Sequence, residues 1–364
     1  MDYQYYGTRT KASELLAFVK HVLKANQRAE EEGRRKTPIT IWGKHGIGKT
    51  EMVEDLARDL GWKFAYIAPA QFEEMGDLVG MPTIEDGRTV FRAPNWVPAE
   101  PGPGILLIDD VNRADDRNLR GIMQLLQNYE MVSWKLPKDW HIILTANPDG
   151  GDYSVTPMDD AMLTRMMHVT LEFEVKEWAR WAESRQVDPR GINFVLTYPE
   201  LVSGIRTTPR TLVQFFESTR ELEDLAAHID LIQILGASTL DPETVAAFIA
   251  YVNQNLADMV SPEAILDSED FSMDVEQPVR EIVSQDTLRV DILAALVTRV
   301  ANFALNDNTS LPPERIENLK RFIKLEFLPN DLRLSLIQDL VSGNRPELAA
   351  ILADQEIAER LLGA

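Results

Sequence analysis

The sequence predicts an α/β fold, in which a parallel sheet flanked by helices is followed by a half that is all helix. Four apolar runs have the length and composition of strands buried on both faces, namely residues 38–42, 63–67, 105–108 and 140–146. Helical patterns lie at residues 13–32 and 51–60, and the chain is helical in pattern from residue 172 onward. Strands that alternate with helices are typical of a parallel sheet.

A glycine-rich loop joins the first strand to the helix after it. The loop and the residue that follows are Gly43, Lys44, His45, Gly46, Ile47, Gly48, Lys49, Thr50 and Glu51. The first eight fit the phosphate-loop pattern GxxxxGK[ST] at every fixed position. Backbone N–H groups and the positive helix end can hold a di- or triphosphate there. We therefore expect Lys49 to contact the β- and γ-phosphates of ATP, and the Thr50 hydroxyl to hold Mg²⁺.

Two acidic residues follow the third strand directly. Asp109 and Asp110 come after Ile105 to Ile108, so they would lie at the carboxyl end of a central parallel strand, as in a Walker B element. We expect Asp109 to bind Mg²⁺, directly or through water, and Asp110 to orient or polarise the attacking water. The alternative is a strand that simply ends in a turn.

The fourth strand ends in Asn147 and Pro148. A polar amide beside the Walker B strand can hydrogen-bond the attacking water or the γ-phosphate, so Asn147 is a sensor candidate. The alternative is an ordinary Asn-Pro turn.

Five motifs in this order, GKHGIGKT, ILLIDDVNRA, TANP, MDDAMLTRM and TTPRTL, resemble those of AAA+ ATPases. Among these ATPases the chain is most similar to the MoxR-like group of the helix-2-insert clade, over roughly residues 38–216. The resemblance implies a P-loop AAA+ core, an α-helical lid, and a homo-oligomeric ring, usually a hexamer, with nucleotide between subunits.

The resemblance also implies roles for three arginines. Arg165 matches the arginine finger, which would reach the γ-phosphate bound by the next subunit and make hydrolysis depend on assembly. Arg210 matches the sensor-2 arginine of the lid, and Pro209 at a first helical position would place it at a positive helix end. Arg113 lies in the NRA sequence of the group, with an expected place at the subunit interface. For each, the alternative is a surface ion pair.

One position departs from the family, which usually has Asp-Glu where this chain has Asp109 and Asp110. The shorter side chain withdraws the carboxylate by about 1.5 Å, although a water could bridge the gap. Slow hydrolysis is therefore one expectation.

Two hairpins are predicted between the strands. Asp86 and Gly87, flanked by β-formers, predict a hairpin within residues 83–91, and a second is expected near residues 128–136. In the resembling family an insert at the first position projects toward the ring axis or a partner. Arg88, Arg92 and Trp96 could contact a client there, whereas local packing is the expectation for Trp96 and Phe91.

Three domains are expected: an AAA+ α/β domain at residues 1–170 that includes the first helix, a helical lid at 171–225, and an acidic helical extension at 226–364. Trp178 and Trp181 are expected in the lid core. Asp241 and Pro242 predict the start of one later helix, with Asp241 as its N-cap. Further helices are expected near residues 287–305, 312–325 and 331–341.

Composition limits the remaining classes. The chain has 364 residues, no cysteine and a formal net charge of −21, and acidic residues outnumber basic ones by 27 to 11 from Thr211 to Ala364. This acidic surface argues against nucleic acid as a partner and is either a solvated face or a docking site for a basic protein. With neither a run of about 18 apolar residues nor a leader-like start, we expect a soluble cytoplasmic protein with no membrane contact.

The function expected from the sequence is therefore that of a Mg-ATP-dependent AAA+ ATPase, a ring that remodels or activates a protein client. The resemblance implies a protein with a von Willebrand factor A domain as one kind of partner. The alternatives are a nucleic-acid-directed ATPase, an ATP-gated assembly scaffold with negligible hydrolysis, and a small-molecule P-loop kinase.

Overall fold

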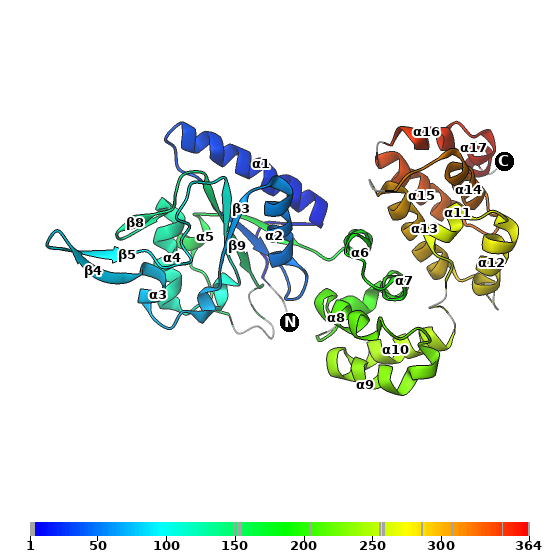
Figure 1. The fold of residues 1–364 in the computed structure, drawn as a ribbon, viewed down its shortest axis with the longest axis horizontal. Helices are drawn as coiled ribbons and strands as arrows, with labels where there is room; N and C mark the ends of the chain where they lie inside the picture. The colour runs from blue at the N-terminus through cyan, green and yellow to red at the C-terminus, as the bar shows by residue number, and fades with distance from the viewer. Residues whose placement is uncertain are drawn as a thin grey trace. The chain divides into compact units, whose positions relative to one another are not determined.

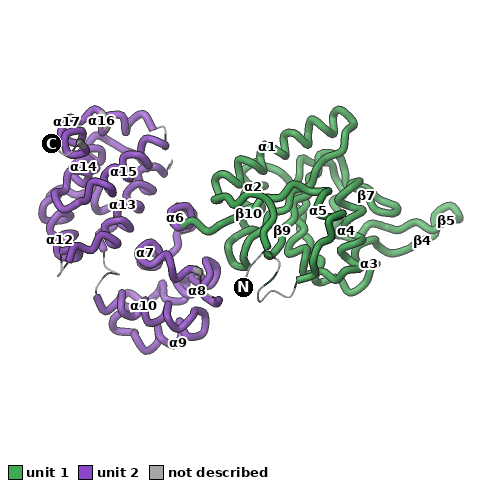
Figure 2. The backbone as a smooth tube through the Cα atoms, turned by 180° about the vertical axis from the view of Figure 1, so that it is seen from behind, with its two compact units in different colours: residues 1–174 green, residues 175–364 purple. Residues whose placement is uncertain are grey.

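The computed structural model describes residues 4–148, 150, 155–203, 205–254, 256, 259–284, 287–306, 309–343 and 345–362. The chain forms two compact units, divided between Glu174 and Val175 (Figure 2). The first unit contains every strand of the described residues, and the second is helical (Figure 1). No helix of the described residues has both the length and the apolar character to cross a membrane.

The first unit is built on a six-stranded parallel sheet in the order β1-β10-β2-β9-β6-β3. The strands are β1 (Thr8–Thr10), β2 (Ile39–Trp42), β3 (Lys63–Ile67), β6 (Gly104–Ile108), β9 (Trp140–Ala146) and β10 (Met167–Leu171). The α/β fold and the four strands predicted from the sequence are confirmed. The two further strands, β1 and β10, extend the sheet at one side, where they pair with each other.

Helices cover both faces of this sheet. They are α1 (Ala12–Glu31), α2 (Lys49–Leu60), α3 (Met75–Val79), α4 (Asp116–Asn128) and α5 (Asp160–Leu163). Side chains of a strand alternate between faces. Ile105 and Leu107 therefore pack with α1 and α2 in one core, while Leu106 and Ile108 pack with α3, α4 and α5 in the other. The carboxyl edge of the sheet is left for the loops that follow the strands.

Both predicted hairpins are present. The longer one pairs β4 (Met81–Glu85) with β5 (Arg88–Arg92) and extends away from the sheet (Figure 1), and the shorter pairs β7 (Glu130–Met131) with β8 (Trp134–Lys135). The indole of Trp96 donates to the Asp77 carbonyl at 3.0 Å and lies edge-on to Trp134. The local packing predicted for Trp96 is confirmed, and the exposed arginines of β5 remain at the surface.

The second unit contains twelve named α-helices among its described residues. They are α6 (Val175–Ser184), α7 (Pro189–Thr197), α8 (Pro209–Thr219), α9 (Ile229–Thr239), α10 (Pro242–Asn253), α11 (Pro262–Asp267), α12 (Gln277–Val283), α13 (Val290–Leu305), α14 (Pro313–Ile323), α15 (Asn330–Ser342), α16 (Ala349–Leu352) and α17 (Gln355–Leu362). Trp178 is buried on α6, whereas Trp181 is only half-buried.

An aromatic cluster joins α7 and α8 to α10. Phe194 contacts Phe216, Phe248 and Tyr251, with ring centroids 5.0 to 6.5 Å apart. The packing therefore continues past residue 225, where the sequence predicted the lid to end.

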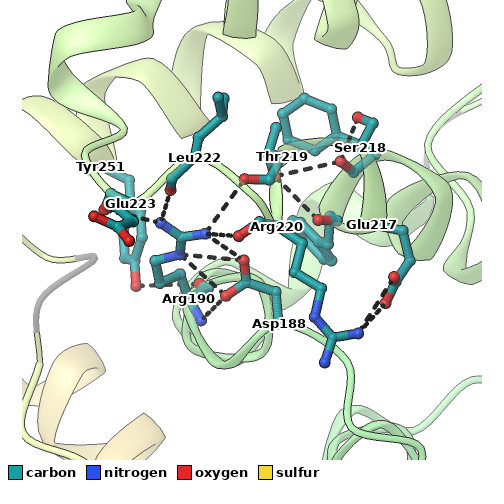
Figure 3. Close-up of polar contacts among 11 residues, drawn as sticks. Asp188, Arg190, Glu217, Ser218, Thr219, Arg220, Leu222, Glu223 and Tyr251 are labelled. Carbon is teal, nitrogen blue, oxygen red and sulfur yellow. Dashed lines mark hydrogen bonds and ion pairs between the residues drawn. The ribbon is translucent and has the colours of Figure 1, made fainter.

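A half-buried arginine closes the end of α8 (Figure 3). Arg190 donates to both carboxylate oxygens of Asp188 and, at 2.6 Å, to the Leu222 carbonyl, with further bonds to the carbonyls of Thr219 and Arg220. Helix ends leave such carbonyls without intrahelical partners. Arg190 thus satisfies the end of α8 and fixes α7 against it.

Asp241 precedes α10, as predicted, but its side chain does not cap that helix. It instead accepts from the backbone N–H groups of Arg206 and Thr207, at 2.9 and 2.7 Å. These bonds lower the pKa of Asp241, although burial opposes them. The residue joins the start of α10 to the segment before α8.

Candidate nucleotide-binding site

The glycine loop after β2 adopts the conformation that its sequence predicts. Gly46 and Gly48 have φ values of 69° and 96°, a region in which residues with a Cβ are strained. Gly48 is the N-cap of α2, so Lys49 is the first helical residue and Thr50 the second. Lys44, His45 and Glu51 are exposed around this turn. The loop therefore turns through two left-handed glycines into a helix N-terminus, a local structure that can bind phosphate.

The Lys49 ammonium group lies within the loop. It donates to the carbonyls of Gly43 and Lys44 at 2.7 and 3.0 Å, and to the Asn147 side-chain oxygen at 3.2 Å. The side chain is buried. Lys49 thus connects the phosphate loop to the tip of β9.

The Asp109 carboxylate accepts hydrogen bonds from three hydroxyl groups, one each on α2, β9 and β3. Its Oδ1 accepts from Thr50 at 2.7 Å and from Thr145 at 2.6 Å, and its Oδ2 accepts from the Tyr66 hydroxyl at 3.2 Å. Partial burial and the Asp109 charge raise the pKa of Tyr66 above its ordinary value, so the phenol stays a donor. The Asp109 carboxylate is therefore fixed beside the first turn of α2.

Asp110 lies on the same edge in an unusual backbone conformation, with φ 47° and ψ 44°. Its Oδ1 accepts from the Asn147 amide at 2.9 Å, and its Oδ2 pairs with Arg113 at 3.3 Å. Because Asn147 also contacts Lys49, a continuous chain of polar contacts runs from the phosphate loop to Asp110. The sequence placed Asn147 beside the attacking water, and in this structure its amide contacts these two residues.

Some residues of this network were not predicted from the sequence. Asn112, fully buried, exchanges two hydrogen bonds with the Asn147 backbone, at 2.8 and 3.1 Å. Thr145 and Tyr66 lie within apolar strands, where the only signal was a hydroxyl in a run that is otherwise apolar.

Arg113, expected at a subunit interface, pairs with Asp110 of its own chain. That pair is i, i+3 in a short turn, a spacing that the sequence does contain.

Arg165 lies toward the opposite edge of the sheet. It precedes β10, whose first residue, Met167, pairs with Ile39 at the start of β2. Thr170, which pairs with Trp42 at the end of β2, is about 10 Å further along the strand. Arg165 donates to the Ala161 carbonyl and, at 3.3 Å, to the Gln127 side chain. The structure therefore does not bring Arg165 together with the phosphate loop of its own chain.

Arg210 belongs to the second unit. It is exposed at the second position of α8, after Pro209. Thr208 caps this helix, since its hydroxyl accepts from the Thr211 N–H and its own N–H donates to the Thr211 hydroxyl. The predicted proline start is confirmed, and the arginine lies in the first helical turn.

The donor set suits a hard cation that also binds phosphate. Thr50 and Asp109 offer hydroxyl and carboxylate oxygens 2.7 Å apart, and Mg²⁺ prefers one or two such protein ligands together with water and phosphate. Within the described ranges, no three His, Asp or Glu side chains cluster to form a metal site of protein ligands alone. Water or phosphate oxygens would complete the ligands of a cation held by Thr50 and Asp109.

A comparison with protein families finds a match that covers the phosphate loop and the acidic residues of this site. Residues 38–166 match the family model described as an AAA domain of the dynein-related subfamily. None of the curated proteins matches the chain in sequence.

Several solved structures resemble the chain at low identity. The RuvB Holliday junction branch migration motor of Thermotoga maritima is 14% identical over 77% of this chain and 86% of that one, with a TM-score of 0.37. A putative ATPase from Cytophaga hutchinsonii is 15% identical over 85% and 88%, with a TM-score of 0.34. NtrX from Brucella abortus is 15% identical over 85% and 64%, with a TM-score of 0.35. The parallel sheet, the phosphate-loop geometry and the match over residues 38–166 together show a P-loop AAA+ fold.

Proposed function

We propose that the chain is a Mg-ATP-dependent AAA+ ATPase of MoxR-like type, which works as a homo-oligomeric ring on a protein client. The observation that carries the proposal is the contact network at the carboxyl edge of the sheet. There Lys49, Thr50, Asp109, Asp110 and Asn147 come from three separate segments and contact one another. A turn that only resembled a phosphate loop would not require these partners.

Each residue has a task that its position supports. The loop amides and Lys49 would bind the β- and γ-phosphates, and the carbonyl contacts that Lys49 makes here would give way to phosphate oxygens. Thr50 and Asp109 would hold Mg²⁺, which when bound neutralises charge on the phosphates. Asp110 would accept a proton from the attacking water, and Asn147 would orient that water or the γ-phosphate.

The place of Arg165 supports hydrolysis between subunits. A residue toward the amino edge of the sheet is poorly placed to reach phosphate at the carboxyl edge of the same chain. A neighbouring subunit that packs this side against the phosphate loop would bring the guanidinium to the γ-phosphate. We therefore propose Arg165 as an arginine finger in trans, in a ring that is usually hexameric in the resembling family.

The other assignments extend this proposal along the chain. Arg210, exposed in the first turn of α8, would contact the γ-phosphate as the sensor-2 arginine. The division into an AAA+ domain, a lid at residues 171–225 and an acidic extension at 226–364 remains our proposal. A protein client, a partner with a von Willebrand factor A domain, and membership of the helix-2-insert clade are also part of this proposal. The projecting β4–β5 hairpin is the candidate surface for contact with the client.

An ATP-gated scaffold is a second candidate, and one observation favours it. The short Asp110 carboxylate is engaged by Asn147 on one oxygen and by Arg113 on the other, and these contacts would compete with the attacking water for it. In that case ATP would fix the assembly and turnover would be negligible. A nucleic-acid-directed ATPase is disfavoured by the acidic C-terminal half.

Phosphate release and molecular mass, measured on the full chain with and without Mg-ATP, test the proposal. We expect turnover together with ATP-dependent assembly, and loss of both ATP binding and turnover in Lys49→Ala. ATP-dependent assembly without turnover would favour the scaffold. A chain that neither hydrolyses ATP nor changes its molecular mass when Mg-ATP is added would overturn both candidates. A pull-down with Asp110→Asn, which should bind ATP without hydrolysing it, then tests for a retained protein client.

A further inference from the structure

The left-handed backbone of Asp110 needs a physical cause. Residues with a side chain rarely adopt φ 47°, and such strain persists only where surrounding contacts impose it. Two backbone contacts do so here. The Asp110 N–H donates to the Thr145 hydroxyl at 2.8 Å, and its carbonyl accepts from the Arg113 N–H at 2.8 Å. The first of these contacts comes from the neighbouring strand, β9.

The same Thr145 hydroxyl also donates to Asp109 Oδ1, at 2.6 Å. A hydroxyl has one hydrogen to donate and lone pairs to accept with, so both contacts are satisfied at once. Because the group accepts from the Asp110 N–H, its own hydrogen is free to point at Asp109. Thr145 is fully buried on β9, a strand paired on both sides. One rigidly held oxygen therefore contacts both acidic residues of the site.

We propose that Thr145 is a positioning residue that fixes Asp109 and Asp110 relative to each other for metal binding and for activation of the attacking water. This inference rests on the proposed ATPase function and adds a residue to it. Thr50 also contacts Asp109, but it is itself a proposed metal ligand. Thr145 has no such task, so its hydroxyl can orient the carboxylate throughout. Partners of this kind behind a metal ligand commonly change metal affinity or activity about 10- to 100-fold when removed.

The substitution Thr145→Val removes the hydroxyl at nearly constant shape. It leaves the Asp110 N–H without its partner and removes one of the two hydroxyl groups that contact Asp109 Oδ1, while Thr50 still contacts that oxygen and Tyr66 the other. Thr145→Ser keeps the hydroxyl and should restore the wild-type behaviour. Thr40→Val is the matched control, since Thr40 is equally buried on the adjacent strand β2 and its hydroxyl contacts the Met166 sulfur, not a carboxylate.

The first measurement is the affinity for a fluorescent ADP analogue, with Mg²⁺ and with EDTA. We expect Thr145→Val to weaken binding about 10-fold or more with Mg²⁺ and to leave binding in EDTA unchanged. The second is ATP turnover, in which kcat should fall about 10- to 100-fold with a smaller change in KM. Thermal unfolding of each variant reports the structural effect alone. Should Thr145→Val not fold, Thr145→Ala removes the same hydroxyl, with the same expectations.

Two results would overturn the inference. One is a hydroxyl-free variant that matches Thr40→Val in Mg²⁺-dependent affinity and in kcat, and the other is Thr145→Ser behaving like Thr145→Val. Both differ from failure of the ATPase proposal, in which the wild-type chain itself would neither bind nor hydrolyse ATP.

Discussion

His141 provides a test of the core beneath the site, through the dependence of stability on pH. The side chain is fully buried on β9 and stacks on Trp62, with ring centroids 5.3 Å apart. Neither ring nitrogen has a hydrogen-bond partner among the described residues. Burial lowers the pKa of His141 from 6.5 to about 4, helped by the charge of Lys36 and opposed by Glu30. The folded chain therefore holds this ring neutral.

The sign and size of the effect follow from that pKa. Between pH 4 and 6.5 the unfolded chain binds a proton at this position and the folded chain does not, so stability rises with pH in this window. From pH 8 to pH 5 the wild type should lose about 2 kcal/mol through His141 alone. In His141→Phe this loss is absent, because the ring no longer titrates. Phe keeps the stack on Trp62 and removes two unpaired polar atoms, so stability at pH 8 should not fall.

Urea unfolding of the full chain, followed by tryptophan fluorescence at pH 8 and pH 5, measures this difference. Five of the seven tryptophans lie in residues 1–174, so the signal mainly reports the first unit. The control is His21→Gln, an exposed histidine on α1, which should follow the wild type at both pH values. An equal loss of stability in the wild type and in His141→Phe would refute the reasoning.

Three further outcomes are expected. Asp110→Asn should abolish ATP turnover and Asp110→Glu should keep or raise it, as measured by phosphate release; an unchanged rate for the Asn variant would place the base elsewhere. If Arg165 is the arginine finger that we propose, Arg165→Ala should reduce turnover by about 10³-fold or more with nucleotide affinity unchanged, because such an arginine stabilises charge in the transition state; a wild-type rate would remove Arg165 from the mechanism. Gly191→Ala should lower the thermal stability of the second unit, since a Cβ there would lie 2.4 Å from the Phe216 ring. Overpacking costs about 1–3 kcal/mol, which equals or exceeds the gain of about 1 kcal/mol in helix propensity, so a higher melting temperature would contradict this packing.

The elements with strong local patterns were predictable from the sequence. Apolar runs followed by polar residues marked β2, β3, β6 and β9 to within a residue or two at each end. Strand β1 has the sequence Thr-Arg-Thr, with no apolar alternation, and exists because it pairs with β10. Strand β10 contains His168, which accepts from the Trp42 indole and hydrogen-bonds the Leu163 carbonyl. Such strands depend on tertiary contacts, which a local pattern does not contain.

The same division holds for the site. The phosphate loop and the acidic pair could be predicted from the sequence, because phosphate and metal binding require fixed residue types at fixed spacing. The contacts between Asn147 and Asp110, or between Thr145 and Asp109, join residues 36 or 37 positions apart. They follow from the pairing of β6 with β9, which places the ends of the two strands side by side. A sequence predicts such a pair only after the strand order is known.

Position 110 has an aspartate, whose side chain is shorter than glutamate, and its backbone is left-handed, with φ 47°. Asp and Asn tolerate the left-handed region better than longer side chains, because their polar groups can bond locally. At Asp110 this conformation places the N–H on Thr145 and the carboxylate within reach of Asn147 and Arg113. Glu would extend further toward a phosphate-bound water but would fit this backbone less readily. Aspartate thus has a shorter reach but a backbone that joins both acidic residues to β9, so the position of the proposed proton acceptor depends on Thr145 as well as on its own side-chain length.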